Sequence, residues 1–151
     1  MTQQLNFNEE LTGKVALVTG GTKGAGKAIS ERLYAAGATV VITARNNPAE
    51  AKEGLYFIAA DLSKAEGTQK VVDEVMAKFG RLDILINNLG GSDTKGGGFI
   101  SLNDTDWERT IQTNLLAPVR LDRAFLPQMI ARKKERCYYP YSFYSGEITL
   151  V

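Results

Sequence analysis

The chain of 151 residues contains no histidine and a single cysteine, Cys137. Without histidine it cannot form a Ser-His-Asp triad, supply an imidazole metal ligand or carry a proton on an imidazole. A single cysteine excludes an internal disulfide and a cysteine-rich metal site. Binding or catalysis therefore has to rest on other residue types.

The chain also lacks a charge imbalance and a long apolar run. Its 18 Lys and Arg residues against 17 Asp and Glu give a net charge of +1, so no strong field attracts nucleic acid or an acidic membrane. The first ten residues, MTQQLNFNEE, have no basic and apolar signal segment, and no apolar run reaches the length of a membrane span. We therefore expect a cytoplasmic protein that binds neither nucleic acid nor membranes.

Residues 14–27, KVALVTGGTKGAGK, join a short apolar run to a glycine-rich turn. Four consecutive apolar residues, 15–18, predict a strand that is buried on both faces. The glycines Gly20, Gly24 and Gly26 can adopt positive φ and let backbone N–H groups approach a ligand, and the following helix points its positive end at the same place. The turn therefore predicts an anion site for a nucleotide phosphate.

The glycine spacing fits two kinds of phosphate-binding loop. Gly20-x-x-x-Gly24-x-Gly26 resembles the coenzyme loop of the short-chain dehydrogenase/reductase family, a variant of the dinucleotide fingerprint. Gly21-x-x-x-x-Gly26-Lys27 is close to an ATP-type loop, but Ala28 stands where a Ser or Thr hydroxyl would hold magnesium. A glycine turn that binds nothing is the third alternative.

The segments that follow favour the dinucleotide loop. Residues 24–37 have apolar positions at helical spacing, and residues 39–44, TVVITA, predict a second buried strand. A strand, a helix and a strand in about thirty residues form a βαβ unit with a right-handed crossover. An ATP-type site needs an acid after the fourth apolar strand, residues 82–88, whereas Asp83 lies at its beginning.

Further elements are expected downstream. Residues 56–60 predict a third strand, and residues 63–79 predict a helix closed by Gly80. A long helix over residues 107–132 should be capped by Asn103 or Asp104 and bent at its prolines. We expect the apolar residues of its first half to face the sheet: Trp107, Ile111, Leu115 and Leu116.

Residues from Lys14 to about Arg132 resemble the short-chain dehydrogenase/reductase family in four motifs that follow the family's order: the glycine loop, Asp61-Leu62, Asn87-Asn88-Leu89-Gly90 and Asn114. The third motif departs from the family's Asn-Asn-Ala-Gly at Leu89. The resemblance implies coenzyme contacts from the glycine loop, adenine contacts from Asp61 and Leu62, and sheet and ribose contacts from Asn88 and Gly90. It implies that Asn114 is catalytic and holds a water in a proton relay. The coenzyme residues of the loop are then Gly20, Thr22, Lys23, Gly24, Ala25 and Gly26.

The end of the second strand lies beside the adenosine ribose in this family. NAD-preferring members usually place an acid there, whereas this chain offers Thr43, Ala44, Arg45 and Asn46. A guanidinium can bind a phosphate in a bidentate manner, and Lys23 can converge from the glycine loop. We therefore expect NADP(H) to be preferred over NAD(H). The alternative is that Arg45 is a solvated loop charge.

The resemblance ends after Arg132. The family continues with a strand that ends in a catalytic Ser and then with Tyr-x-x-x-Lys, but none of the six tyrosines here has a lysine four residues later. Residues 133–151 contain Pro140 and many tyrosines, which is unusual for a buried strand. We therefore expect a lead-in (1–13), a Rossmann-like dinucleotide-binding domain (14–132) and an atypical tail (133–151). Truncation, or a reading-frame slip near Lys134, would explain the tail.

The expected fold class is α/β, a partial Rossmann-like doubly wound parallel sheet with strand order 3-2-1-4 and without the C-terminal half of the family fold. The expected function is the NADP(H)-binding portion of a carbonyl or alcohol oxidoreductase, inactive as written because Tyr-x-x-x-Lys is absent. The alternatives are a non-catalytic nucleotide-binding module and a non-functional truncated gene product. We also expect a homo-oligomer, formed through the apolar outer face of the long helix or through the open edge of the fourth strand.

Overall fold

A six-stranded sheet forms the centre of the molecule, with strand order β3-β2-β1-β4-β5-β6. The structure, a computed structural model, describes residues 10–46, 54–91, 99–132, 136–138 and 148–149. The expected order 3-2-1-4 is confirmed for the first four strands, which are all parallel. Their bounds are β1 (Val15–Thr19), β2 (Thr39–Ala44), β3 (Leu55–Ala59) and β4 (Ile84–Ile86).

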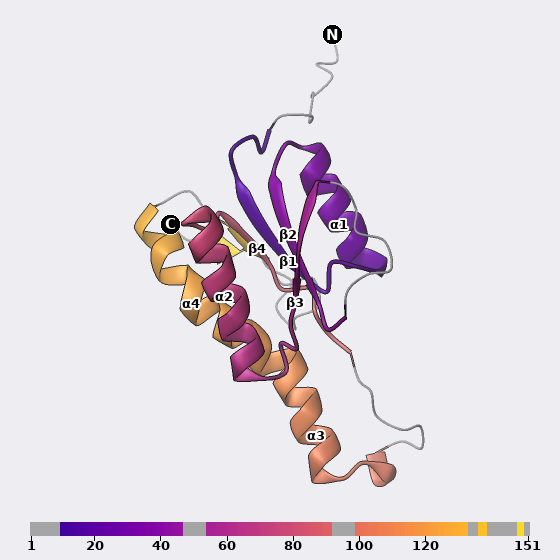
Figure 1. The fold of residues 1–151 in the computed structure, drawn as a ribbon. Helices are drawn as coiled ribbons and strands as arrows, with labels where there is room; N and C mark the ends of the chain where they lie inside the picture. Colours follow the sequence, from indigo (N-terminus) through magenta and orange to yellow (C-terminus); the bar gives the residue numbers. More distant parts are fainter. Residues whose placement is uncertain (1–9, 47–53, 92–98, 133–135, 139–147, 150–151) are drawn as a thin grey trace.

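Helices cover both faces of this sheet (Figure 1). Helix α1 (Gly24–Ala35) packs on one face, where Ala16 and Val18 of β1 belong to the buried cluster. Helices α2 (Ala65–Phe79) and α4 (Ala117–Arg132) pack on the other face, against Val15 and Leu17. Alternate residues of β1 therefore enter two different cores, which explains why its apolar run shows no alternation with polar residues.

The long helix consists of three segments: α3 (Asp104–Ile111), a π-helical turn (Gln112–Leu116) and α4. Of the two expected caps, Asn103 fills the role, because its side chain accepts the N–H of Asp106 at 3.0 Å and the Asp106 side chain accepts the N–H of Asn103 in return. Pro118 has no N–H to donate to the preceding turn, and the regular hydrogen-bond ladder is interrupted there.

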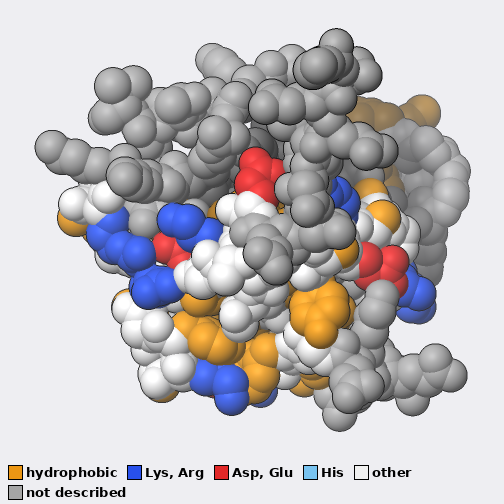
Figure 2. Space-filling model, turned by 90° about the horizontal axis from the view of Figure 1, so that it is seen from above, with side chains coloured by type: hydrophobic (Ala, Val, Ile, Leu, Met, Phe, Trp, Pro, Cys, Tyr) orange, Lys and Arg blue, Asp and Glu red, His pale blue; other side chains and the backbone are white. Residues whose placement is uncertain are grey.

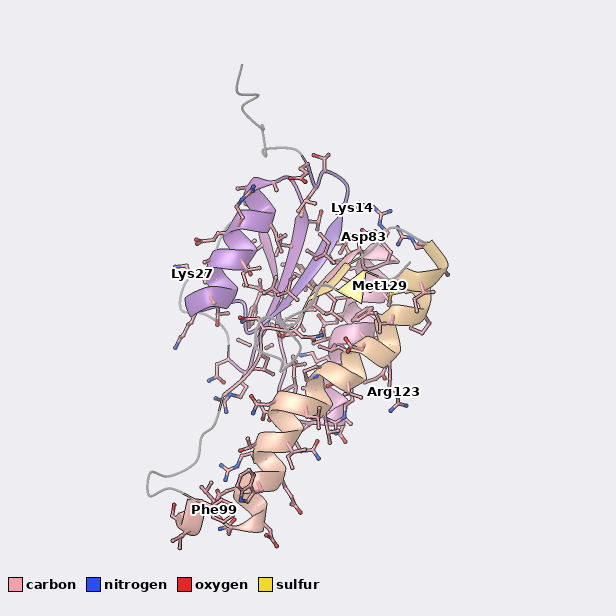
Figure 3. The ribbon with its side chains drawn as sticks, turned by 180° about the vertical axis from the view of Figure 1, so that it is seen from behind. Lys14, Lys27, Asp83, Phe99, Arg123 and Met129 are labelled. Atoms are coloured by element: carbon pink, nitrogen blue, oxygen red, sulfur yellow. The ribbon has the colours of Figure 1, made fainter. Side chains whose placement is uncertain are left out.

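The expectation that the first half of this helix faces the sheet is wrong. The side chains of Trp107, Ile111 and Leu115 are 43%, 45% and 56% exposed, and Leu116 lies outside the buried core. The physical reason is the length of the helix, because α3 extends beyond the carboxyl ends of the strands and has no strand beneath it (Figure 1). The sheet-facing residues belong to α4 instead, at Leu121, Phe125 and Met129, the last of which is labelled in Figure 3.

The expectation that β4 is an open edge is also wrong. Strand β5 (Arg136–Tyr138) pairs with β4 in parallel, and β6 (Ile148–Thr149) pairs with β5 in antiparallel orientation. Backbone N–H and C=O groups make this ladder, so the unusual side chains of the tail do not prevent it. Strand β5 ends two residues before Pro140, which therefore does not interrupt the pairing. Among the described helices, none combines the length and hydropathy of a bilayer span.

Asp83, which directly precedes β4, joins three parts of the fold and is 1% exposed. Its Oδ2 accepts the N–H of Val15 at 2.8 Å and the Nε of Arg81 at 3.1 Å, and its Oδ1 accepts a guanidinium N–H of Arg132 at 2.9 Å. Burial raises the pKa of Asp83, but the Val15 N–H and the two guanidinium groups outweigh burial and hold the pKa below its ordinary value.

Asp83 lies at the end of the sheet that is uppermost in Figures 1 and 3. Figure 2 views the molecule from above this end, and its described part shows basic side chains beside acidic ones, with hydrophobic groups next to them. The carboxylate of Asp83 thus ties the beginning of β1 and the end of α4 to the segment that enters β4.

Replacing Asp83 with Asn should lower the free energy of unfolding by about 2 kcal/mol or more at pH 7, because the Val15 N–H and the Arg81 and Arg132 guanidinium groups lose their charged acceptor. Since the folded-state pKa of Asp83 lies below that of the unfolded chain, its contribution is present above about pH 4 and is lost as the pH falls through the folded-state pKa. Urea unfolding at pH 7 and at lower pH measures both effects.

Asp73→Asn is the matched control, because Asp73 is exposed on α2 and bonds only the Gln69 amide among the described residues. This variant should unfold within about 0.5 kcal/mol of the original chain. Equal stabilities for the two variants would contradict the role given to Asp83.

Candidate functional site

The glycine loop between β1 and α1 has positive φ at two of the three glycines for which the sequence allows it. Gly20 and Gly24 have φ angles of 65° and 51°, in the left-handed region that favours glycine. Gly26 is required for a different reason, because a Cβ there would overlap the Gly20 carbonyl oxygen and the Asn88 side-chain amide. The loop therefore packs directly against the end of β4.

Asn88 holds the loop in place. Its Nδ2 donates to the carbonyl oxygens of Thr19 at 2.9 Å and Gly20 at 3.3 Å. In the other direction, the N–H of Leu89 donates to the Thr19 hydroxyl at 2.8 Å. Side-chain hydrogen bonds thus join the carboxyl ends of β1 and β4 after the point where their backbone pairing ends.

Helix α1 begins directly after this loop. Its N-cap residue, Lys23, has extended backbone, and its side chain makes no capping hydrogen bond. The N–H groups in the first turn of a helix have no acceptor within the helix and carry partial positive charge. This helix end can therefore receive an anion, such as a phosphate, from the side of the glycine loop.

Two hollows lie over the carboxyl ends of the strands. The first has a volume of about 390 Å³ and the second about 480 Å³, and they share Gly20, Leu89, Gly90 and Gly91. The remaining residues of the first hollow are Thr43, Ala44, Arg45, Ala60, Asp61, Leu62, Ser63, Lys64, Arg109, Thr110 and Thr113. The remaining residues of the second are Lys23, Ala25, Gly26, Asn88 and Asn114. A ligand that passes over Gly20 can therefore occupy both.

Most of the residues expected at the site line one of these hollows. Gly20, Arg45, Asp61, Leu62 and Gly90 lie in the first, and Lys23, Ala25, Gly26, Asn88 and Asn114 lie in the second. Thr22 and Gly24 line neither, and the role of Gly24 is to turn the backbone. Lys23 and Arg45 are not brought together in one hollow; Arg45 shares its hollow with Lys64 and Arg109 instead.

Asn114 lies in the π-helical turn and bonds the backbone that follows β4. Its Oδ1 accepts the N–H of Gly91 at 2.9 Å, and its Nδ2 donates to the carbonyls of Gly91 at 2.8 Å and Thr110 at 2.9 Å. The amide thus holds the floor that the two hollows share. The residues of the loop that follow, 92–98, lie outside the described part of the chain.

Asp61 is placed by the turn between β3 and α2. Its Oδ1 accepts the N–H of Ser63 at 3.1 Å and the Ser63 hydroxyl at 2.7 Å, so it shapes this turn and does not cap α2, whose N-cap is Lys64. A Cβ at Gly67 would overlap the Asp61 carbonyl oxygen. The close approach of α2 therefore fixes Asp61 at the wall of the first hollow.

The structure adds residues that the motifs did not identify. Thr43 lines the first hollow, is 1% exposed, and its hydroxyl has no hydrogen-bond partner among the described residues. A buried hydroxyl without a partner is costly, and because this oxygen is shielded from the hollow, a polar group could reach it only after a local shift. Thr43 lies at the end of the second strand and was within reach of sequence reasoning, whereas Lys64 lines the hollow as the N-cap of α2. Arg109 was not within reach, because nothing in the sequence indicates which face of α3 lines the first hollow.

The model of the family described as short chain dehydrogenase matches residues 14–136 of this chain. The chain belongs to that family. Glucose 1-dehydrogenase 2 of Bacillus subtilis is 35% identical over 132 residues, which cover 81% of this chain and 51% of that protein. The chain spans about half the length of the curated relatives that it matches.

Solved structures show the same likeness. A metagenomic short-chain oxidoreductase in complex with NADP matches with a TM-score of 0.78 and 35% identity, over 87% of this chain and 62% of that one. L-sorbose reductase from Gluconobacter frateurii, complexed with NADPH and L-sorbose, matches with a TM-score of 0.73 and 32% identity, over 83% of this chain and 51% of that one. The fold and the family of this chain are thereby established.

Two alanine substitutions separate the two roles of glycine in the loop. Gly24→Ala has open space around the new Cβ but a positive φ, so it should cost about 1 kcal/mol of stability. Gly26→Ala meets backbone and the Asn88 amide, so it should cost about 2 kcal/mol or more and displace the loop. Urea unfolding measures the stabilities, and the amide chemical shifts of Thr19 and Asn88 should move in the second variant only. Equal shifts in both variants would disprove the packing role.

Proposed function

We propose that this chain binds NADP(H) across the carboxyl ends of β1 to β4 and does not by itself transfer hydride. The observation that carries the proposal is the pair of hollows joined at Gly20, beside the first turn of α1 and the ends of β2 and β3. An extended ligand with a phosphate group in its middle fits this arrangement, because the beginning of α1 lines the second hollow together with Gly20, at which the two hollows are joined.

The residues present fit such a ligand. Gly26, Lys23 and Ala25 at the beginning of α1 line the second hollow, and Arg45, Asp61 and Leu62 line the first. We propose that the N-terminus of α1, with Lys23, receives the pyrophosphate and that Arg45 faces the adenosine 2′-phosphate. Asp61 can accept a hydrogen bond from the amine of adenine. When bound, the coenzyme would supply a nicotinamide able to donate or accept hydride.

The proposed absence of turnover rests on the sequence. The family's general acid is the Tyr of Tyr-x-x-x-Lys, and no tyrosine of this chain precedes a lysine at that spacing. Without a positioned acid, a carbonyl reduction lacks the proton that must follow the hydride. The function that we propose is therefore coenzyme binding. The described residues also contain no group of three His, Cys, Asp or Glu side chains able to hold a metal.

Arg45→Gln should weaken NADPH binding about tenfold or more and leave NADH binding within about twofold, because only NADPH carries the 2′-phosphate that a guanidinium would bind. Isothermal titration with both coenzymes measures the two affinities. Incubation with NADPH and a panel of aldehydes and ketones should give no oxidation beyond the rate without protein. Equal affinity of the original chain for NADPH and NADH would refute the preference.

Lys27→Gln is the matched control, since it removes one positive charge from α1 at a position that lines neither hollow. Figure 3 shows Lys27 on the outer side of α1. NADPH affinity should change by less than about twofold, because an exposed charge at this distance is screened by solvent. A large loss of nucleotide binding in this variant would favour the ATP-type loop, in which the lysine binds phosphate.

We further propose that the exposed apolar face of α3 and α4 joins two copies of the chain. Ile111, Leu115 and Val119 follow one another at intervals of four residues and are 45%, 56% and 38% exposed. Apolar side chains gathered on one helix face indicate a contact surface, since water solvates them poorly. The same face is open to a partner because α3 lies beyond the sheet (Figure 1).

Leu115→Lys should shift the chain from dimer to monomer, because a charge in the centre of the apolar face must be desolvated on association. Sedimentation velocity at several concentrations measures the change. Thr105→Lys adds the same charge at an exposed polar position of α3 and should leave the dimer intact. A monomeric original chain at every concentration would contradict the proposal.

A further inference from the structure

Arg109 is a cation in the first hollow that no coenzyme motif of the chain includes. It belongs to α3 and lines the hollow together with Thr110 and Thr113, whereas Arg45 reaches the same hollow from the end of β2. Two guanidinium groups therefore meet one ligand site from different elements. The contacts of Arg109 indicate which part of a ligand it would recognise.

The guanidinium of Arg109 is held along one side. Its terminal nitrogen donates to Asp106 Oδ1 at 3.0 Å. Asp106 is itself fixed, because its Oδ2 accepts the Asn103 N–H at 3.2 Å and its own N–H donates to Asn103 Oδ1 at 3.0 Å. A guanidinium bound to a carboxylate has less charge to offer a phosphate, but its flat face stays available for stacking.

The neighbouring walls suit a flat base better than a phosphate. Ala60 and Leu62 are buried and apolar, and Thr110 adds a short side chain next to Arg109. Asp61 lines the same hollow, and only its Oδ1 accepts hydrogen bonds from the described residues. Its carboxylate repels a phosphate but can accept a hydrogen bond from an exocyclic amine.

We propose that Arg109 is a base-recognition residue, whose guanidinium stacks on the adenine of the bound nucleotide while Asp61 accepts its amine. The inference rests on the proposed coenzyme function and assigns a new residue to that site. It also separates two tasks within one hollow: Arg109 binds the base, and Arg45 binds the 2′-phosphate. The Asp106 carboxylate orients Arg109 and limits its attraction for phosphate.

The separation predicts two different patterns of lost affinity. Arg109→Gln should weaken 5′-AMP and 2′,5′-ADP by the same factor, about five- to tenfold, because both carry adenine and lose the same stacking contact. Arg45→Gln should weaken 2′,5′-ADP alone. Nicotinamide mononucleotide, which has no adenine, should bind both variants as it binds the original chain.

NMR titration of the full chain with these three nucleotides tests the inference. Arg123→Gln is the matched control, because Arg123 is exposed and projects outward from α4 (Figure 3), and it should leave all three affinities unchanged. Thermal unfolding should give the same midpoint for Arg109→Gln and Arg123→Gln, which excludes a merely structural effect.

The outcomes are distinct. Equal losses for 5′-AMP and 2′,5′-ADP in Arg109→Gln, with the mononucleotide unaffected, support base recognition. A loss confined to 2′,5′-ADP would make Arg109 a phosphate ligand and overturn the inference. Affinities equal to those of Arg123→Gln would overturn it as well, while the coenzyme function would stand. If the original chain binds none of the three nucleotides, the inference and the coenzyme function both fail.

Discussion

The close contact between the glycine loop and the end of β4 is the constraint on which the site depends. The Asn88 amide bonds the last carbonyl of β1 and the first carbonyl of the loop, and Gly26 leaves just enough room for it. The residues after Asn88 then form the floor that both hollows share. If this contact loosened, the first turn of α1 and the floor of the two hollows would separate.

β4 is a short strand in a central position, so its place is secured at both ends by side chains. Its ladder with β1 involves only three residue pairs, Ala16–Ile84, Leu17–Leu85 and Val18–Ile86. The buried Asp83 carboxylate anchors the entry of the strand to β1 and α4, and Asn88 anchors its exit. The polar anchors compensate for the few backbone hydrogen bonds and set the register, which aligns the site.

The sequence predicts features that depend on local chemistry. The positive φ at Gly20 and Gly24, the buried apolar run of β1 and the strand order follow from glycine spacing and from the βαβ pattern. The sequence does not predict features that depend on how far a helix or strand extends in space. Trp107 belongs to an apolar stripe at helical spacing, yet it is exposed because α3 extends beyond the sheet. The apolar periodicity of a helix does not indicate how far the helix extends. The position of Arg109 in the first hollow also depends on where α3 lies, which no motif indicates.

The pairing of β5 with β4 was not predicted, because the side chains of the tail are unusual for a strand. Backbone groups form the ladder in spite of this composition. This pairing also bears on how the functions of the family can separate. The described residues that line the first hollow all precede Asn114. Hydride transfer requires an acid that the family supplies after that point. In the proposed function, the described residues that would bind the coenzyme therefore precede the segment in which the family places its general acid.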